Sequence, residues 1–379
     1  MILTGIAAIG LAAWVYLLRF RGGFWLMRER DDRDLPPDPA AWPSVTAVVP
    51  ARNEADVIAR SIGSLLAQDY PGEFRVILVD DNSDDGTAVR AAETKTGAER
   101  LTILPGQPLA RGWTGKLWAV SQGVAAAAQP TWLWITDADI AHDPQTLRRL
   151  VARAEAGQLT LVTLMARLQT GTWPERLLIP AFVYFFDMLF PFGLVNDPRR
   201  KLAAAAGGCM LVRRTALEAA GGIAAIRGEI IDDCALGAKL KAQGPIWLAL
   251  TRTSVSLRPY LTLGEIGRMV SRSAYAQLQY SPALLAGTVL GMLLIYAAAP
   301  VLFALASGPA RWLGLAAWGL MTISFQPMLR YYRLSPLWGL ALPLIGGLYT
   351  WFTVQSAIDV WRGKGGMWKG RAQALAASQ

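Results

Sequence analysis

Uncharged apolar runs at both ends of the chain constrain its fold more than any other feature. Residues Met1 to Leu18 carry no charge, and three later runs of at least 18 uncharged residues are Ala283–Ala306, Trp312–Leu329 and Leu337–Ile358. A helix of about 20 apolar residues crosses the hydrocarbon core of a bilayer. We therefore predict an N-terminal transmembrane anchor within residues 1–20 and a C-terminal transmembrane region at residues 283–360.

Basic residues beside the first run predict its orientation. Arg19, Arg21, Arg28, Arg30 and Arg33 follow it. A cleaved signal peptide carries its positive charge before the apolar stretch and ends at a small-residue cleavage site, and this run shows neither feature. We interpret the run as an uncleaved anchor, and the positive-inside rule places the following segment in the cytoplasm.

The basic tail at residues 361–379 conflicts with a simple count of crossings. It contains Arg362, Lys364, Lys369 and Arg371 and no acidic residue. One anchor and three further spans would leave this tail outside, whereas positive charge should stay inside. Either the run Leu337–Ile358 is re-entrant or another apolar run is not a span, and the sequence leaves both alternatives open.

Composition excludes two other classes of protein. The formal charge is +9, but lysines and arginines flank the apolar runs instead of forming a basic stripe with interleaved aromatic residues, so we expect no nucleic acid as a partner. Cys209 and Cys234 lack the spacing of metal ligands, and two thiols in 379 residues do not form a disulfide framework. These features favour a reduced, cytoplasmic domain at a membrane surface.

A folded α/β domain is predicted at residues 44–280, after the proline-rich linker Asp34–Pro43. Its first part alternates short β-branched runs with helical stretches, which is typical of βαβ units and a mainly parallel sheet. The predicted strands are Val45–Val49, Phe74–Val79, Leu101–Leu104 and Trp132–Thr136, and the predicted helices lie near Glu54–Gln68, Thr87–Thr96 and Lys116–Ala128.

An aromatic segment within this domain indicates a further contact with the membrane. Residues Leu177–Val195 contain six aromatic side chains, a single charge at Asp187, and prolines at positions 180 and 191. The prolines argue against one continuous span. We predict an interfacial helix pair that lies on the bilayer.

The first candidate site segment is Val48–Glu54, where a buried strand runs into Pro50, Ala51, Arg52, Asn53 and Glu54. Ligands bind at the carboxyl ends of parallel strands, and the N-terminus of a helix presents free N–H groups to a phosphate. These residues are therefore candidates for substrate binding. The alternative is an ordinary strand-to-helix connection capped by Asn53.

Four aspartates follow the next predicted strand, at Asp80, Asp81, Asp84 and Asp85. Carboxylates this crowded repel one another, so some should accept hydrogen bonds from a ligand. Asp80 and Asp81 are the candidates for a base N–H or a ribose hydroxyl. For Asp84 and Asp85 we favour a structural role as caps of the following helix.

The predicted strand Trp132–Thr136 ends in Asp137-Ala138-Asp139. Two carboxylates at one strand end can approach a single divalent cation, and Mg²⁺ or Mn²⁺ takes such oxygen ligands while bridging the phosphates of a nucleotide. We expect Asp137 and Asp139 to bind Mg²⁺ or Mn²⁺. His142, the single histidine, is interpreted as a loop residue after this motif.

The segments VVPARNEA, VDDNSDDGT and TDADI, in this order and spacing, resemble the nucleotide-sugar domain of family-2 glycosyltransferases. The resemblance implies a GT-A fold, with a Rossmann-like mixed, mainly parallel sheet, and N-terminal and C-terminal transmembrane helices flank it here. It also implies a nucleotide-sugar donor, with UDP expected, and it places the base near Asp80 or Asp81.

The same resemblance assigns the reacting groups. Ile231-Asp232-Asp233-Cys234-Ala235-Leu236 is similar to the family's (E/D)D-x-x-L motif, which implies that Asp233 is the general base for an inverting transfer and that Asp232 lies beside it. Lys116, in a family Gly-Lys pair, is expected near the donor because a lysine at a helix start calls for an anionic partner. Gly208 resembles a position that lines the acceptor side.

One motif departs from the processive relatives, which carry (Q/R)-x-x-R-W. The nearest stretch here is Met269-Val270-Ser271-Arg272-Ser273, so Arg272 fits the arginine that contacts the diphosphate, while Ser273 replaces the tryptophan. This disfavours a processive polysaccharide synthase. A degenerate GT-A domain that serves as a membrane scaffold is a second alternative, although the acidic motifs it should have lost are all present.

Over nearly its whole length the chain resembles the bacterial hopanoid-biosynthesis-associated glycosyltransferases. The likeness includes LPPDPAAWPSVTAVVPARNEA, GWTGKLWA and Trp368-Lys369-Gly370-Arg371. It implies a multi-pass protein of the bacterial inner membrane with a cytoplasmic catalytic domain, and a membrane lipid as the acceptor. The sugar and the oligomeric state are left open.

Overall fold

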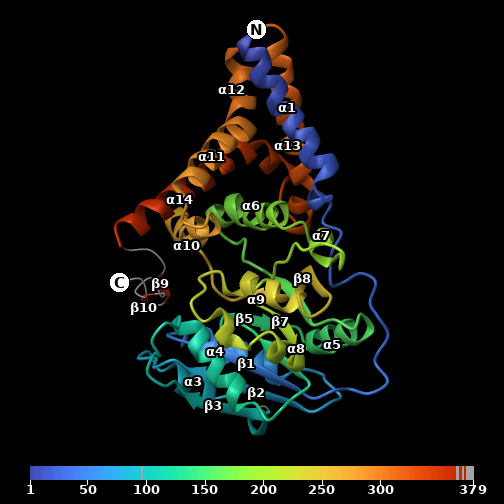
Figure 1. The fold of residues 1–379 in the computed structure, drawn as a ribbon, viewed down its shortest axis with the longest axis vertical. Helices are drawn as coiled ribbons and strands as arrows, with labels where there is room; N and C mark the ends of the chain where they lie inside the picture. Colours follow the sequence, from blue (N-terminus) through green and yellow to red (C-terminus); the bar gives the residue numbers. More distant parts are fainter. Residues whose placement is uncertain (95–96, 364–366, 369–370, 373–379) are drawn as a thin grey trace. The chain divides into compact units, whose positions relative to one another are not determined.

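The computed structural model describes residues 1–94, 97–363, 367–368 and 371–372. Its contacts divide the chain into two compact units (Figure 1). The sheet unit comprises Glu29–Gln169, Leu194–Pro259 and Gly366–Gln379, and the helical unit comprises Met1–Arg28, Thr170–Gly193 and Tyr260–Gly365. Residues 170–193 and 260–280 therefore group with the helices and not with the sheet, where the predicted boundaries 44–280 had placed them.

The sheet unit is built on one eight-stranded mixed sheet. Its order is β3 (Leu101–Pro105), β2 (Phe74–Asp80), β1 (Val45–Ala51), β4 (Trp132–Ile135), β7 (Met210–Arg213), β6 (Leu161–Arg167), β8 (Ile246–Ser256) and β5 (Ile140–His142). The pairs β1–β2, β1–β4, β2–β3 and β6–β8 are parallel, and β4–β7, β6–β7 and β5–β8 are antiparallel. The predicted mainly parallel α/β sheet is confirmed.

Short helices connect these strands. They are α2 (Ile58–Leu66), α3 (Thr87–Ala92), α4 (Gly115–Ala126), α5 (Thr146–Ala156), α7 (Phe192–Asn196), α8 (Arg214–Ala219) and α9 (Asp232–Lys241), with 3₁₀ turns η2 (Ala98–Arg100) and η3 (Ile223–Ile226). The helix predicted near Glu54 begins only at Ile58. A turn precedes it, in which the N–H groups of Val57 and Ile58 both donate to the Glu54 carbonyl, at 3.0 and 2.9 Å.

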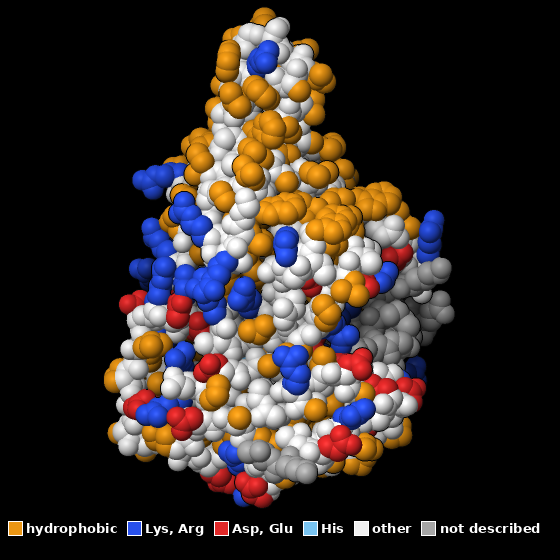
Figure 2. All heavy atoms as spheres, turned by 180° about the vertical axis from the view of Figure 1, so that it is seen from behind, with side chains coloured by type: hydrophobic (Ala, Val, Ile, Leu, Met, Phe, Trp, Pro, Cys, Tyr) orange, Lys and Arg blue, Asp and Glu red, His pale blue; other side chains and the backbone are white. Residues whose placement is uncertain are grey.

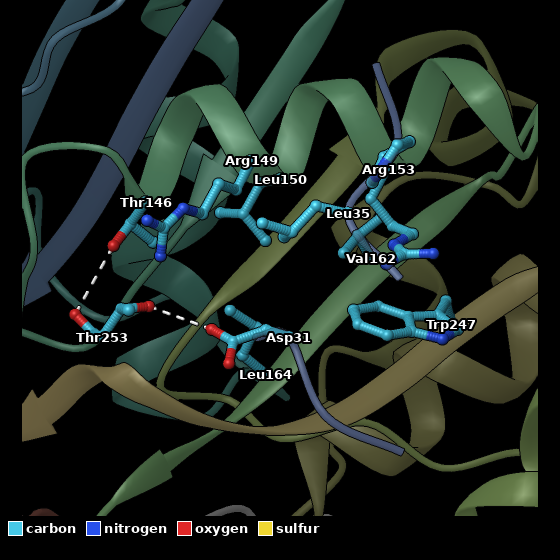
Figure 3. A pocket seen from close by; sticks show the side chains of 11 residues that line it. Asp31, Leu35, Thr146, Arg149, Leu150, Arg153, Val162, Leu164, Trp247 and Thr253 are labelled. Carbon is cyan, nitrogen blue, oxygen red and sulfur yellow. Dashed lines mark hydrogen bonds between the residues drawn. The ribbon is translucent and has the colours of Figure 1, made fainter. Parts of the chain in front are cut away.

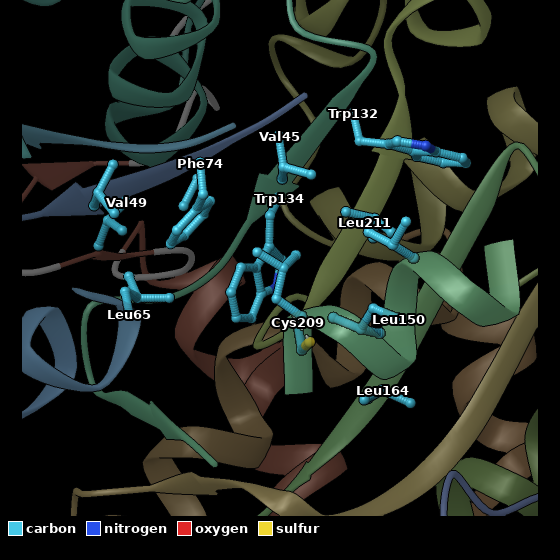
Figure 4. Close-up of a cluster of buried hydrophobic side chains, with 14 of the residues drawn as sticks. Val45, Val49, Leu65, Phe74, Trp132, Trp134, Leu150, Leu164, Cys209 and Leu211 are labelled. Atoms are coloured by element: carbon cyan, nitrogen blue, oxygen red, sulfur yellow. Dashed lines mark hydrogen bonds between the residues drawn. The ribbon is translucent and has the colours of Figure 1, made fainter. Parts of the chain in front are cut away.

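The core lies along the strands and beneath α2 and α5. Every residue of β1 is buried, and Trp132 and Trp134 of β4 are completely so. Figure 4 shows Trp134 among Phe74, Leu65 and Cys209, side chains that come from three different elements and one loop. Each of these large apolar side chains stabilises the fold by about 1.5–3 kcal/mol when it is buried. Their packing holds the strand ends in fixed positions.

The linker before β1 is part of the sheet unit. Arg30 forms a bridge with Leu250 of β8, and the Arg153 guanidinium donates to the Arg33 carbonyl at 3.0 Å. Figure 3 shows Asp31 directed at Thr253 in a pocket where Arg153 covers the ring of Trp247. The proline-rich stretch thus packs on the sheet, and the unit begins before Ser44.

The helical unit contains ten helical segments among the described residues. They are α1 (Ile2–Phe20), η1 (Phe24–Leu26), α6 (Trp173–Leu189), α10 (Leu263–Gln277), α11 (Pro282–Met292), the π-helical η4 (Leu293–Ala297), α12 (Ala298–Leu305), α13 (Pro309–Tyr331), η5 (Pro336–Ala341) and α14 (Leu342–Trp361). Two short strands, β9 (Met367–Trp368) and β10 (Arg371–Ala372), pair near the C-terminus. Lys364 and Lys369 of the predicted tail lie outside the described residues.

Three stretches of the described helices are long and apolar enough to cross a membrane: Ile2–Phe20, Pro282–Leu305 and Pro336–Trp361. Figure 2 shows hydrophobic side chains over much of the surface of the helical unit. The predicted span Trp312–Leu329 lies in α13, which is not among the three, because polar residues such as Thr322 and Gln326 lower its hydropathy. By length and composition this favours one of the two alternatives left open, that another run is not a span, and the number of crossings stays a prediction.

Two sets of contacts show how η5 and α14 pack within the helical unit. Gln326 Nε2 of α13 donates to the Pro336 carbonyl at 3.1 Å and Trp318 Nε1 to the Leu340 carbonyl at 3.1 Å, so η5 runs back along α13. The last residue of α14, Trp361, packs edge-on against Tyr275 with ring centroids 5.8 Å apart. Since Tyr275 also clusters with Leu285 of α11, α14 ends beside the start of α11.

The aromatic segment predicted at Leu177–Val195 forms two helices, α6 and α7, that separate at Pro191. Pro180 is accommodated inside α6. The Tyr184 hydroxyl pairs with the Ser324 hydroxyl at 2.7 Å, and the Tyr349 hydroxyl donates to the Leu178 carbonyl at 2.9 Å. One face of α6 is therefore buried against α13 and α14, and its interfacial position stays a prediction.

Gly123 tests the close contact of α4 with the sheet. A Cβ at this position would lie 2.5 Å from Val48 Cγ1 and 3.1 Å from Val79 Cγ2. We expect Gly123→Ala to lower the free energy of unfolding by about 1–3 kcal/mol despite the better helix propensity of alanine. The measurement is chemical unfolding of the detergent-solubilised protein.

Gly63 in α2 is the matched control, since its added Cβ would meet only Thr94 Cγ2, at 4.0 Å. Gly63→Ala should leave stability unchanged or raise it by up to about 1 kcal/mol. Equal effects of the two substitutions would show that α4 does not pack on β1 as described.

Candidate functional site

The candidate site lies where β1, β2 and β4 end. Because β1 pairs in parallel with both neighbours, their carboxyl ends meet at one edge of the sheet, as predicted. Pro50 and Ala51 are the last two residues of β1, paired with Val79 and Asp80 of β2, and Ala51 is fully buried. The segments after these strands therefore begin side by side.

The loops after β1 and β2 hold each other in place. Arg52 donates to the Asp81 and Asn82 carbonyls at 2.5 and 3.0 Å, and the Asn53 N–H donates to the Ser83 hydroxyl at 3.0 Å. The Glu54 N–H donates to the Thr87 hydroxyl at 2.8 Å. These bonds make a rigid double loop, and they show Arg52 in a structural role that sequence reasoning did not predict.

The four aspartates of the second loop differ in their surroundings. Asp80 accepts a hydrogen bond from the Ser83 hydroxyl, and Asp81 is completely buried. Asp85 is exposed and accepts from the N–H groups of Thr87 and Ala55, at 3.0 and 2.9 Å, so it serves the start of α3 as expected. Asp84 is exposed, and its N–H donates to Asn53 Oδ1 at 3.1 Å.

Lys116 joins the metal motif to the acidic motif of α9. It lies in the first turn of α4, whose N-cap Thr114 accepts from the Leu117 N–H. Its Nζ is 3.0 Å from Asp137 Oδ1 and 3.1 Å from Asp232 Oδ2. Burial by itself would lower the pKa of Lys116, but these carboxylates raise it. The anionic partner that we expected from a ligand is therefore supplied by the chain itself.

Asp233 is held at the start of α9 by two backbone donors. Its Oδ2 accepts from the Gly207 N–H at 3.0 Å and its Oδ1 from the Cys234 N–H at 2.7 Å. Burial, followed by the negative charge of Asp232, raises the pKa of Asp233 to about 6. A carboxylate with this pKa is suited to accept a proton near neutral pH.

Arg258 was missed by sequence reasoning, because no motif surrounds it. Its Nε lies 3.3 Å from Asp139 Oδ2 and its Nη2 donates to Glu54 Oε2. Burial, together with the charge of Asp137, raises the pKa of Asp139, while Arg258 opposes this shift. Arg258 therefore connects the first candidate segment with the metal motif.

His142 is a buried residue of β5, so its interpretation as a loop residue is wrong. Its ring lies between the hydroxyls of Thr136 and Ser254, at 2.9 and 2.8 Å, and burial lowers its pKa to about 3. The Thr136 hydroxyl also donates to the Gly208 carbonyl at 2.8 Å. The neutral histidine thus supports the strand end that carries Asp137.

The remaining predicted residues lie on different elements. Gly208 lies just before β7, and a Cβ added there would be 3.1 Å from Ala166 Cβ. Its neighbour Gly207 is close to Lys116, since a Cβ added there would be 3.2 Å from Lys116 Nζ. Lys116, Asp232 and Asp233 line one end of a small cavity whose other walls are apolar, including Ile223, Ile226 and Leu236. Arg272 lies on α10 of the helical unit, and its contact with a diphosphate stays a prediction.

The donor set suits a metal that is shared with a substrate. No group of three or more His, Cys, Asp or Glu side chains that could hold a metal occurs in the part of the chain that the structure describes. Mg²⁺ is usually bound through one or two carboxylates together with substrate phosphates. Asp137 and Asp139, two residues apart and both half-buried, are carboxylates of this kind, and their binding of a metal stays a prediction.

The chain is similar to known glycosyltransferases over part of its length. Residues 46–221 match the model of glycosyl transferase family 2. The chain is 39% identical over 114 residues to the succinoglycan biosynthesis protein ExoO of Rhizobium meliloti, covering 30% of each chain. It is 28% identical over 186 residues to the beta-monoglucosyldiacylglycerol synthase of Trichormus variabilis, covering 48% of this chain and 38% of that one. The matches thus span about a third of the length of these relatives.

A solved structure shares the fold over a greater length. The mannosyltransferase of Pyrobaculum calidifontis, crystallised with GDP-mannose and Mn²⁺, superposes with a TM-score of 0.58 at 22% identity, covering 95% of this chain and 99% of that one. This likeness shows the GT-A fold. Residues 46–221, which carry the strand-end carboxylates of β2 and β4, form a glycosyl transferase family 2 domain.

Proposed function

We propose that the chain is an inverting glycosyltransferase that moves a sugar from a nucleotide sugar, with UDP as the expected nucleotide, to a membrane lipid. The observation that carries this proposal is the charged row at the sheet edge. Its members are Glu54, Arg258, Asp139, Asp137, Lys116, Asp232 and Asp233. Five carboxylates and two cations leave this row negative, so it favours a divalent cation.

In the proposed reaction Asp233 removes the proton from the acceptor hydroxyl. The hydroxyl oxygen forms a bond to the anomeric carbon, and the bond from that carbon to the diphosphate oxygen breaks with its electron pair. A bound Mg²⁺ or Mn²⁺ would neutralise the leaving diphosphate. Asp137 and Asp139 would hold the ion, while Lys116 keeps the Asp137 and Asp232 carboxylates in place.

The donor would lie along the ends of β1 and β2. Asp80 or Asp81 is the proposed contact of the base and ribose; Asp80 ends β2 and is the more accessible of the two, since Asp81 is completely buried. Arg52 fixes the backbone of their loop. Gly207 lies against Lys116 and Asp233, where an added Cβ would be 3.2 and 3.6 Å from their atoms, and the adjacent Gly208 is the proposed contact of the acceptor side. The crystallised neighbour contains GDP-mannose, which supports a nucleotide sugar without identifying its base here.

The proposal of a lipid acceptor rests on the candidate spans and on one relative. Three stretches are long and apolar enough to cross a membrane, and the relative from Trichormus variabilis is a glucosyldiacylglycerol synthase. We propose a multi-pass protein of the bacterial inner membrane, with its sheet unit and tail in the cytoplasm and a hopanoid-related lipid as the acceptor. Three crossings would keep the basic tail inside.

Asp233→Asn tests the general base. Because the amide cannot accept the proton, we expect kcat to fall by about 10²–10⁴-fold while nucleotide binding is retained. Transfer from a radiolabelled UDP-sugar to extracted membrane lipid measures turnover, and calorimetric titration measures binding. Asp84→Asn on the exposed part of the β2 loop is the control and should remain active.

Unaltered turnover by the Asp233→Asn variant would exclude Asp233 as the base. If the parent protein neither binds nor turns over any nucleotide sugar with Mn²⁺ or Mg²⁺, the proposed function is wrong.

The pH profile provides a second test of Asp233. Since its pKa is raised to about 6 and the base must be ionised, kcat/KM should be half-maximal near pH 6 and fall about tenfold per unit below that. Asp232→Asn removes a negative charge that raises this pKa, so the acidic limb should move to lower pH. A limb that stays in place in this variant would assign it to another group.

The acceptor is tested in cells. Lipid extracts of a deletion strain should lack a species whose mass exceeds that of a retained lipid by one sugar residue, and mass spectrometry would detect the pair. Complementation with the parent gene should restore the species, and complementation with the Asp233→Asn gene should not. A lipid profile that is unchanged by the deletion would contradict a lipid acceptor.

A further inference from the structure

Arg258 lies opposite the metal motif because of strand register. In the β5–β8 ladder Ile140 pairs with Ser256, and the next bond along the ladder joins the Leu257 N–H to the Asp139 carbonyl at 2.7 Å. The Arg258 N–H then donates to the Ser256 hydroxyl at 3.3 Å. Arg258 therefore follows directly after the residue whose N–H is bonded to the Asp139 carbonyl.

The two cations of the charged row differ in exposure. The Lys116 side chain is 16% exposed and lies between two carboxylates, whereas the Arg258 side chain is 36% exposed and bridges Glu54 and Asp139, which are 11% and 22% exposed. Of these two, Arg258 is the more accessible to a molecule that arrives from solvent. Its position beside Asp139 places it next to the proposed metal–diphosphate site.

The chemistry of the side chain fits a diphosphate. A guanidinium carries five N–H donors in a planar fork that matches both carboxylate and phosphate, so phosphate oxygens can take the place of one of its carboxylate partners. The charged row is otherwise negative and would repel a nucleotide diphosphate. A cation at its exposed end offsets that repulsion where the phosphates must approach.

We propose that Arg258 binds the diphosphate of the donor, an inference that rests on the proposed function. Glu54 and Asp139 hold the guanidinium at the strand edge before the donor arrives. Glu54 then acts as a positioning residue that competes with the diphosphate for Arg258. Loss of Arg258 should therefore weaken diphosphate binding, whereas loss of the Glu54 charge should not.

The test is calorimetric titration of the detergent-solubilised full chain in the presence of Mn²⁺. UDP, GDP, ADP and CDP are screened against the parent, and the tightest ligand is compared with its own monophosphate. Arg258→Met should weaken the diphosphate about tenfold to a hundredfold and the monophosphate less, since charge-assisted hydrogen bonds are lost. Arg258→Lys should recover part of the affinity, and Glu54→Gln should bind the diphosphate as tightly as the parent or more tightly.

Arg213→Met is the matched control. Arg213 is also a partly exposed arginine that pairs with a carboxylate, Glu155. It is the last residue of β7 and pairs with Trp132 at the start of β4, the opposite end of that strand from Asp137. This variant should lose stability without losing nucleotide affinity.

Three outcomes would overturn the proposal for Arg258. These are an Arg258→Met variant that binds the diphosphate like the parent, equal weakening of diphosphate and monophosphate, or equal losses of affinity in Arg258→Met and Glu54→Gln together with a lower unfolding temperature in both. The last result would make the bridge structural only. A parent protein that binds none of the four diphosphates would instead overturn the proposed function.

Discussion

The ion pairs of Lys116 allow the acidic motifs of this chain to lie together. Asp137 follows β4 and Asp232 begins α9, and the lysine bridges them at 3.0 and 3.1 Å. Without a buried cation, carboxylates this close would repel one another and shift toward their protonated forms. Arg258 serves Asp139 and Glu54 in the same way at the other end of the row.

This charge arrangement connects the fold to the chemistry we propose. The core around Trp134 and the buried, neutral His142 hold the end of β4, so Asp137 and Asp139 are presented from a rigid strand. On α9 the adjacent carboxylates have unlike roles: Asp232 pairs with Lys116, while burial raises the pKa of Asp233. A carboxyl group whose pKa is raised toward neutral is suited to act as a general base.

The helical unit has its own organisation. Hydrogen bonds to other helices of the unit are formed by the polar atoms of Tyr184, Tyr349 and Trp318. These polar groups in apolar surroundings therefore find their hydrogen-bond partners within the unit. The return of η5 along α13 and the contact of Trp361 with Tyr275 bring the end of α14 back to the start of α11. A count of apolar runs contains no such information, because it treats each run as independent.

The amino-acid pattern alone predicts the strands that carry the site and the types of side chain at their ends. Alternating β-branched runs followed by Pro50, Asp80 and Asp137 suffice for that, since both are local properties of the chain. Only the tertiary structure decided which charges meet. Lys116 pairs with carboxylates from two distant segments, Arg258 reaches Asp139 through the β5–β8 register, and residues 170–193 join the helical unit. The physical reason is that ion pairing and helix packing depend on distances between segments far apart in sequence, which no local pattern encodes.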